Sequence, residues 1–205
     1  MSLTSIFATP FWHYNVAPVN SAYEWALNYE RNNQGCFRSN RGGYQSKSMV
    51  WDEFMYKDHI SNTLKLAEML GTCFSDYEII SWWLNINRKG HYNLPHDHGD
   101  SCLSGTWYIT DNQKLLYLTD PNLLTRGALY EDIFPSIMGY ELSNKCIEAT
   151  AGDLILFPGD VTHGVEENPL DTPRISVSFN MKKPSILRKK EVRIRENAHI
   201  HKSLK

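Results

Sequence analysis

The sequence lacks closely spaced cysteines and long hydrophobic runs. Its four cysteines, Cys36, Cys73, Cys102 and Cys146, form no CxxC pair. Their spacing therefore argues against a zinc knuckle, and at this chain length we expect reduced structural thiols rather than a disulfide framework. No apolar run approaches the ~20 residues that a membrane-spanning helix needs. The first residues have neither the basic start nor the sustained apolar core of a signal peptide, so we expect a cytoplasmic protein without a membrane partner.

Basic charge is scarce outside the C-terminal segment. Residues 182–205 hold nine Lys and Arg against two Glu, a charge of +7, and leave −9 on the rest of a chain whose net charge is −2. Because this body has no basic stripe, we expect residues 182–205 to form a solvated tail and do not expect a nucleic acid partner. Residues 1–181 are enough for one domain, with a helical part over about residues 1–76.

Two amphipathic helical segments occupy the N-terminal part. Residues 20–33 and 58–74 repeat apolar side chains at near-helical intervals, so each segment has a stripe to bury. Ser21 and the glutamate three residues later have the spacing of a capping box, and Asp58 can cap the second helix. Between the helices, residues 37–46 read FRSNRGGYQS. This stretch is rich in Gly, Ser and Asn, which predicts a loop.

Many short strands follow the helices. Residues 78–88 alternate, so that Trp82 and Leu84 share one side and Trp83 and Asn85 share the other. Further strand candidates, separated by turn residues, are LSGTWYIT, KLLYLT, KCIEAT, DLILFP and RISVSFN. The order of helices and then strands indicates a mainly β (α+β) fold. We expect a closed antiparallel barrel or a two-sheet jelly roll with the N-terminal helices packed on one outer face.

Metal-capable side chains recur at strand spacing in NLPHDHGDSCLSGTWYI, residues 93–109. His96, His98 and Asp100 occupy every second position, and side chains in that register project from one side of a strand. Imidazole nitrogens suit iron, zinc or copper. His163 follows a strand and a PGD turn, which makes it the best distant candidate for a further ligand. We therefore predict a metal site built from two separate parts of the chain.

The last strand, RISVSFN, has one apolar and one polar face. Arg174, Ser176 and Asn180 lie on the polar face, which either meets water or lines a cavity. Arg174 stands eleven positions after His163. The chain thus presents an HxH pair, a distant His and an Arg on the final strand, in that order.

This order resembles the 2-oxoglutarate and Fe(II)-dependent oxygenases, and more closely a family of such oxygenases found in phages and marine bacteria. The matching stretches run in order through most of residues 6–181 and are FATPFW, SNRGGYQS, WLNINRKGHYNLPHDH, LSGTWYI, the DP pair at Asp120, GDLILFPGDVTHGV and RISVSFN. The resemblance implies a double-stranded β-helix, the cupin-like jelly roll. It also implies a dioxygenase of the hydroxylase type that uses Fe(II) and 2-oxoglutarate. The expected substrate is a small molecule or a peptide, and an oligomer is compatible with the sequence.

Carried over by position, the resemblance assigns roles to residues of this chain. His96, His98 and His163 would bind the iron, and Arg174 would pair with the distal carboxylate of 2-oxoglutarate, because a guanidinium offers two parallel donors to a carboxylate. The hydroxyl groups that could also bind the cosubstrate are those of Ser176 and Tyr108. The side chains that could line the substrate cavity are Asn85, Asn180 and Trp83.

The chain departs from the usual pattern of these oxygenases at His98, where a carboxylate is expected. Three imidazoles supply no charge to balance Fe(II), so the 2-oxoglutarate dianion would have to supply it. His98 and Asp100 also form HxD, which leaves His98, Asp100 and His163 as an alternative ligand set. Gly99 can turn Asp100 aside, which favours the three histidines. Two other functions remain open: a three-His cupin-type dioxygenase that does not use 2-oxoglutarate, and a non-catalytic jelly-roll module that binds a metal or a sugar.

Overall fold

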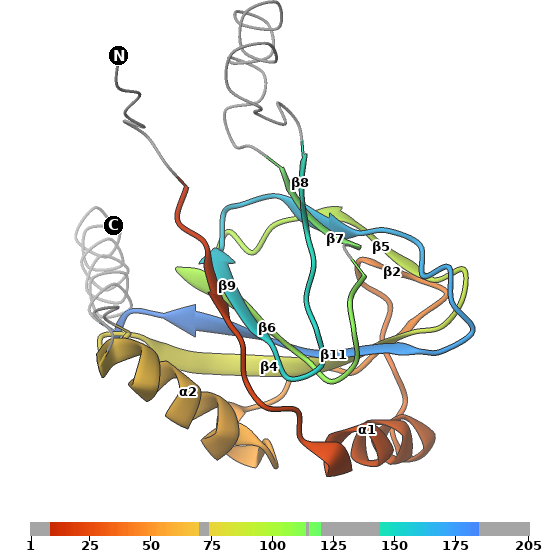
Figure 1. Ribbon diagram of the computed structural model, residues 1–205, viewed down its shortest axis with the longest axis horizontal. Helices are drawn as coiled ribbons and strands as arrows, with labels where there is room; N and C mark the ends of the chain where they lie inside the picture. Colours follow the sequence, from red (N-terminus) through yellow and green to blue (C-terminus); the bar gives the residue numbers. More distant parts are fainter. Residues whose placement is uncertain (1–8, 70–73, 114, 120–143, 185–205) are drawn as a thin grey trace, which may run out of the picture.

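The computed structural model describes residues 9–69, 74–113, 115–119 and 144–184. Within them the helices are α1 (Asn20–Asn32), a short 3-10 helix η1 (Trp51–Glu53) and α2 (Lys57–Met69). The strands are β1 (Trp12–Tyr14), β2 (Asn40–Arg41), β3 (Tyr44–Gln45), β4 (Glu78–Asn87), β5 (Tyr92–His96), β6 (Leu103–Tyr108), β7 (Leu116–Thr119), β8 (Asn144–Ile147), β9 (Leu154–Pro158), β10 (His163–Val165) and β11 (Arg174–Lys182). Figure 1 shows their arrangement.

Two antiparallel sheets form the body of the molecule. The larger has the strand order β1-β9-β6-β11-β4-β3 and the smaller the order β2-β5-β10-β7-β8. Between them, Ile155 and Phe157 of β9 pack with Leu116 of β7 and Ile147 of β8. The fold is therefore a mainly β, two-sheet double-stranded β-helix, as the sequence predicted.

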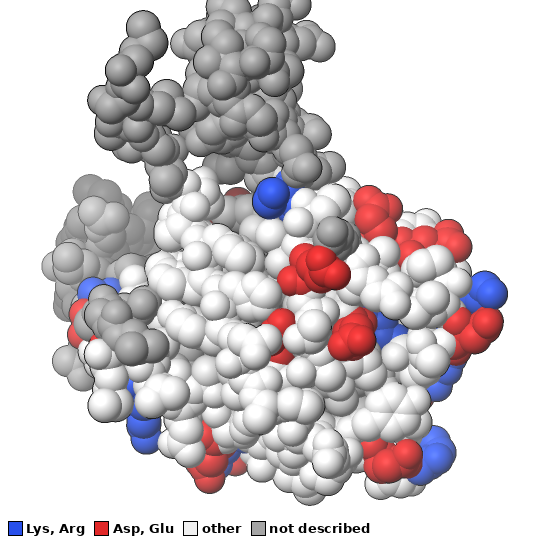
Figure 2. Space-filling view, in the orientation of Figure 1, with Lys and Arg blue, Asp and Glu red and all other residues white. Residues whose placement is uncertain are grey.

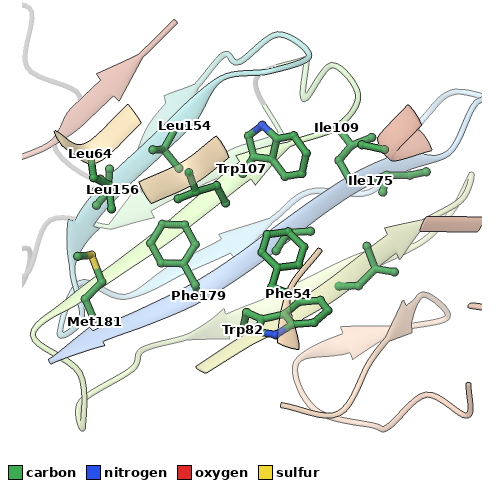
Figure 3. Packing of buried hydrophobic residues seen from close by; sticks show 14 of the residues in the cluster. Phe54, Leu64, Trp82, Trp107, Ile109, Leu154, Leu156, Ile175, Phe179 and Met181 are labelled. Atoms are coloured by element: carbon green, nitrogen blue, oxygen red, sulfur yellow. The ribbon is translucent and has the colours of Figure 1, made fainter. Parts of the chain in front are cut away.

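Both α-helices cover the outer face of the larger sheet (Figure 1). Ala22 and Ala26 of α1 and Ile60 of α2 are almost fully buried in the same cluster as the outward side chains of β4 and β11. Figure 3 shows the aromatic part of this cluster, in which the rings of Phe54 and Trp82 are 4.5 Å apart. This packing confirms the predicted position of the helices on one outer face.

Strand alternation separates the apolar core from a polar interior. On β11, Val177 and Phe179 are fully buried under the helices. The intervening Ser176 and Ser178 point between the sheets and line a pocket there. Phe179 also explains a glycine in β6, because a Cβ on Gly105 would collide with the Phe179 ring on the neighbouring strand. The predicted two-faced pattern of β4 and β11 is thus confirmed.

The predicted helix starts are wrong in detail. α1 has Val19 at its N-cap and no side-chain hydrogen bond there. The Ser21 hydroxyl lies instead 3.1 Å from the Tyr56 hydroxyl. α2 already begins at the residue before Asp58, so the Asp58 carboxylate lies in the first turn of the helix. In both cases packing of the apolar stripe, not a capping side chain, sets where the helix begins.

The segment 37–46, predicted as a loop, contains two strands. β2 pairs with β5 in the smaller sheet, whereas β3 pairs with β4 in the larger one, so the chain crosses between the sheets here. The buried Asn40 side chain holds the crossing, since its Nδ2 donates to the Gly43 carbonyl at 2.7 Å and its Oδ1 accepts from the Arg38 N–H at 2.7 Å. A strand of two residues is too short to show an alternating pattern in the sequence. Its pairing depends on partners that are distant in the chain.

A buried carboxylate ties β1 to the start of β9. Asp153 is 2% exposed, and its Oδ2 lies 2.9 Å from Nε2 of His13 and accepts from the Thr150 N–H at 2.8 Å. Its Oδ1 accepts from Nδ2 of Asn15 at 2.8 Å. Burial by itself raises the pKa of Asp153, but the hydrogen bonds from Thr150 and His13 outweigh it, and the pKa is lower than usual. The ionised form is therefore the one that stabilises the fold.

We expect Asp153→Asn to lower the free energy of unfolding at pH 7 by about 2 kcal/mol, because an amide NH₂ would face groups that donate to the carboxylate. The pKa of Asp153 is lower in the folded protein than its unfolded value of about 3.9. Its ionic contribution is thus present above that pH and is lost as the pH falls through the folded pKa. The difference between the variant and the natural protein should consequently shrink below about pH 4. Urea unfolding at several pH values measures it.

The matched control is Asp171→Asn. Asp171 is 90% exposed and pairs with Lys89 at 3.0 Å on the surface. Its loss should cost under about 1 kcal/mol. A difference for Asp153→Asn that persists unchanged into acid would contradict the role given to the Asp153 charge.

The described cysteines are free thiols, namely Cys36, Cys102 and Cys146. Cys146 is exposed, so the expected structural role does not extend to it. Cys73 lies outside the described residues. No helix among those that the structure describes is long and apolar enough to span a membrane.

Charged side chains are interspersed on the face shown in Figure 2, where Lys and Arg form no continuous stripe. Most of the predicted basic tail, residues 185–205, lies outside the described part of the chain. The DP pair at Asp120 lies outside it as well.

Candidate metal centre

Two of the three candidate histidines face each other across a strand pair. His96 is the last residue of β5, His163 is the first residue of β10, and the two are direct antiparallel partners. Side chains of directly opposed residues project from the same face of a sheet. The centroids of the two imidazole rings are 4.4 Å apart. The sheet register itself therefore joins the two parts of the chain that the sequence singled out.

His98 reaches the same place from outside the strand. β5 ends at His96, so the prediction that residues 96, 98 and 100 share one strand is wrong. The backbone N–H of His98 donates to the Gly159 carbonyl at 2.7 Å, and its carbonyl accepts from the Ser101 N–H at 2.7 Å. The His98 ring centroid lies 5.1 Å from each of the other two rings. Backbone hydrogen bonds beyond the strand end thus replace strand alternation as the means of positioning His98.

The three imidazoles can offer their nitrogens to one cation. One ligand atom from each of His96, His98 and His163 lies within 4.8 Å of the others. Nδ1 of His96 lies 2.8 Å from the Leu94 carbonyl, and Nδ1 of His163 lies 3.0 Å from the Val161 carbonyl. Because a carbonyl only accepts, each of these Nδ1 atoms carries the proton and leaves the lone pair on Nε2. The donor set therefore fits a transition metal.

The surroundings keep these rings neutral. Burial, followed by the charge of the neighbouring His96, lowers the pKa of His163 to about 3 and that of His98 to about 4. Burial also lowers the pKa of His96 itself. The walls responsible include Phe157, 4.7 Å from the His163 ring, and Trp83, 5.4 Å from the His98 ring. Neutral imidazole is the form that binds metals.

Asp100 does not belong to this group. It is exposed, whereas His96 and His98 are half-buried and His163 is buried. Of the two ligand sets that the sequence left open, only the three-histidine set has its ligand atoms together in the described residues.

The histidines line one end of a narrow pocket between the sheets. The other predicted residues that line it are Trp83, Asn85, Tyr108, Arg174 and Ser176. Asn180, also predicted to line the cavity, lies instead in an adjoining groove. The pocket thus brings together the metal-capable and cosubstrate-binding candidates from four different strands.

Arg174 is a buried cation with almost no partner. Its side chain is 6% exposed, Nη1 donates to the Glu166 carbonyl at 3.2 Å, and Nη2 has no hydrogen-bond partner. Burial lowers the pKa of Arg174 to about 10, so it remains charged at pH 7. No carboxylate pairs with it among the described residues. An isolated buried charge is costly, which means that the pocket is suited to an anion at this guanidinium.

Tyr108 and Ser176 stand beside Arg174. They are direct antiparallel partners on β6 and β11, and both line the pocket. Burial raises the pKa of Tyr108, so its phenol stays protonated and can donate a hydrogen bond. Near the middle of the pocket, Nδ2 of Asn85 donates to the Ser178 hydroxyl at 3.1 Å. The pocket wall therefore offers several polar groups among its apolar side chains.

Several lining residues were not predicted. Nδ2 of Asn87 donates to Asn93 at 2.7 Å, and Nδ2 of Asn93 donates to the Ser39 hydroxyl at 3.2 Å. Asn112 is fully buried at the same pocket. Asn87 could have been found from the alternation of β4. The other three carry no sequence signal, because they come from irregular or very short segments whose neighbours are distant in the chain.

Solved structures of other proteins share the fold. HygX from Streptomyces hygroscopicus with nickel and 2-oxoglutarate bound matches with a TM-score of 0.58 and 10% identity, over 85% of this chain and 83% of that chain. A Pseudomonas putida prolyl-4-hydroxylase matches with a TM-score of 0.59 and 13% identity, over 85% and 93%. A Trichoplax adhaerens prolyl hydroxylase, in complex with a hypoxia inducible factor peptide fragment, matches with a TM-score of 0.54 and 14% identity, over 85% and 84%. At these identities the likeness concerns the fold.

A sequence comparison points to the same class of protein. No curated protein sequence matches the chain. Residues 81–180 match the family described as "Putative 2OG-Fe(II) oxygenase". This range runs from β4 through most of β11 and contains the three histidines and Arg174. The match covers 100 of the 205 residues, and it shows that this part of the chain is similar to a family of Fe(II)- and 2-oxoglutarate-dependent oxygenases.

Proposed function

We propose that this protein is a hydroxylase in which His96, His98 and His163 bind Fe(II) and Arg174 binds the distal carboxylate of 2-oxoglutarate. One observation carries the proposal: a buried guanidinium that has no counter-ion in the described part of the chain shares a narrow pocket with three neutral imidazoles. The two parts of the pocket suit ligands of opposite charge, since the imidazole lone pairs bind a cation and the guanidinium binds an anion. A diacid bound beside Fe(II) satisfies both.

When bound, Fe(II) and 2-oxoglutarate supply the activation of dioxygen, in which 2-oxoglutarate gives succinate and carbon dioxide and one oxygen atom is inserted into a substrate C–H bond. The protein's part is to bind, orient and shield. Arg174 fixes the far end of the cosubstrate, and the Tyr108 and Ser176 hydroxyls donate hydrogen bonds beside it. Trp83 and Phe157 keep water from the imidazoles.

A three-His dioxygenase that does not use 2-oxoglutarate is the second candidate. His98 favours it, because it stands where these oxygenases usually have a carboxylate and so leaves the metal without ligand charge. That candidate gives Arg174 no partner, however, whereas the 2-oxoglutarate dianion supplies both the missing charge and the counter-ion. The similarity of residues 81–180 to a family of oxygenases argues against the non-catalytic binding module.

Addition of Fe(II) and 2-oxoglutarate to the protein without oxygen should produce a visible charge-transfer absorption band. The band requires the keto acid to chelate a metal that the protein holds, and it needs no substrate. Anaerobic titration with either component measures it, and glutarate, which has two carboxylates but no keto group, is the matched control.

The outcome separates the candidate functions. Fe(II) binding that is indifferent to 2-oxoglutarate would indicate the three-His dioxygenase. Failure to bind Fe(II) at all would overturn the proposed centre. If the charge-transfer band forms, admission of oxygen to that complex should slowly convert 2-oxoglutarate to succinate even without substrate. A metal-binding module would not catalyse this conversion.

A further inference from the structure

A second, larger cavity adjoins the metal centre. It is a groove of about 870 Å³, and it shares Trp83, His96 and His98 with the inner pocket. The inner pocket offers only about 50 Å³. Because the proposed function places 2-oxoglutarate in the inner pocket, a substrate would lie in the groove, where it would reach the two histidines from outside.

The walls of the groove differ in character. One wall is formed by the crossing segment 37–46 and the residues that flank it, and it contributes the exposed side chains of Arg38 and Lys47. The other wall is β5, which contributes Leu94 and Pro95. The pairing of β2 with β5 holds the two walls together, and Figure 1 shows the two strands side by side.

The two cations in the groove have no counter-ion. Neither the guanidinium of Arg38 nor the ammonium of Lys47 makes a hydrogen bond or ion pair with the described residues, and no Asp or Glu is among the described residues that line the groove. The nearby Arg41 differs, because its Nη1 donates to backbone carbonyls, among them that of Asn40 at 2.9 Å, and its guanidinium lies 4.6 Å from the Phe37 ring. Arg41 is thus used within the protein, whereas Arg38 and Lys47 are available to a ligand.

The groove also has an apolar part next to the metal centre, where the Trp83 ring lies 5.4 Å from that of His98. Trp83 is 9% exposed and forms the floor that the groove shares with the inner pocket. Leu94 and Pro95 continue it along β5. A ligand that fills this space gains from burying an apolar body there and from placing an anionic group at the outer rim, next to Arg38 and Lys47.

We propose that this groove is the substrate site and that it selects an acidic substrate, with an apolar body on Trp83, Leu94 and Pro95 and an anionic group at Arg38 and Lys47. The inference rests on the proposed function for the position of the reacting centre, and it adds the class of substrate. The apolar body would lie beside His96 and His98, and the anionic group would lie farther out. The oxidised carbon is accordingly in the apolar part of the substrate.

The test compares two probes that differ only in charge: N-acetyl-L-phenylalanine and its uncharged carboxamide. Their dissociation constants are measured by calorimetry on the anaerobic protein with Fe(II) and 2-oxoglutarate bound. We expect the acid to bind about tenfold more tightly than the amide, since it gains ion pairs with two exposed cations. High salt should remove most of that preference without changing the binding of the amide.

Arg38→Glu/Lys47→Glu should abolish the preference, whereas Arg31→Glu/Lys65→Glu, with the same change in net charge at exposed helical positions outside the groove, should retain it. Equal binding of acid and amide, binding of neither, or a preference that survives in the first double variant would overturn the inference. The charge-transfer band is recorded in the same samples. If the band is absent, the proposed function fails, and the probes are compared on the metal-free protein.

Discussion

Replacement of His163 by alanine should remove Fe(II) binding and, with it, the charge-transfer band. His163 is the most buried of the three histidines, and its Nδ1 hydrogen bond to Val161 aims Nε2 at the point where the rings meet. Loss of a residue that merely orients a ligand already costs about 10- to 100-fold in metal affinity. We therefore expect a loss of more than about 100-fold for the ligand itself. Anaerobic calorimetry with Fe(II) measures it.

His163→Gln guards against a folding defect, because glutamine keeps most of the volume and lacks the imidazole nitrogen. His91→Ala is the matched control, since His91 lies in the turn between β4 and β5, outside the group of three rings. It should leave the affinity for Fe(II) unchanged. Full affinity in both His163 variants would refute the three-histidine centre.

Anaerobic calorimetry with Fe(II) also decides whether His98 belongs to a set with His96 or to one with Asp100. His98→Ala should lose Fe(II) as His163→Ala does, whereas Asp100→Ala should keep it, because the Asp100 carboxylate is exposed and outside the group. The reverse result would restore the ligand set of His98, Asp100 and His163. It would require the loop after β5 to turn over on metal binding.

The polar interior was predictable because strand alternation is a strong constraint. Arg174, Ser176 and Asn180 alternate with apolar residues on a nine-residue strand, and a slip by one position would place every apolar side chain on the wrong face. The partner strand β4 shows the same two-faced pattern, so the two strands together define which side faces the helices and which side faces the pocket. Alternation alone left open whether this polar face meets water or lines a cavity, and the resemblance to the oxygenases favoured the cavity.

The position of His98 was not predictable in the same way. The HxH spacing suggested a shared strand, but β5 ends at His96 and hydrogen bonds with Gly159 and Ser101 set the place of His98. The bond to Gly159 joins segments about sixty residues apart, and no local sequence pattern predicts it. The crossing segment 37–46 eluded prediction for the same reason, because its pairing partners lie on two different sheets.

Arg174→Met should have opposite effects on the stability of the protein without 2-oxoglutarate and on its affinity for 2-oxoglutarate. Without ligand, the natural protein holds a cation with one hydrogen bond, and replacing such a buried charge by an apolar side chain of similar size often stabilises a protein by about 1–4 kcal/mol. We expect the free energy of unfolding of the variant to exceed that of the natural protein when both are measured by urea unfolding without 2-oxoglutarate. The natural protein should become the more stable of the two once 2-oxoglutarate and metal are added at the same concentrations, because it binds 2-oxoglutarate much more tightly and is stabilised more by it.

The affinity for 2-oxoglutarate should fall in Arg174→Met by about 30- to 3,000-fold, as when one partner of a buried charge pair is removed. Arg174→Lys keeps the charge but loses the pair of parallel donors, so its affinity for 2-oxoglutarate should lie between those of the natural protein and Arg174→Met. The control is Arg88→Met, which breaks an exposed ion pair with Glu30 at 2.6 Å and should change neither quantity appreciably. If Arg174→Met were less stable without ligand and bound 2-oxoglutarate normally, the guanidinium would be a structural element. The group that binds the distal carboxylate would then have to be sought elsewhere in the pocket.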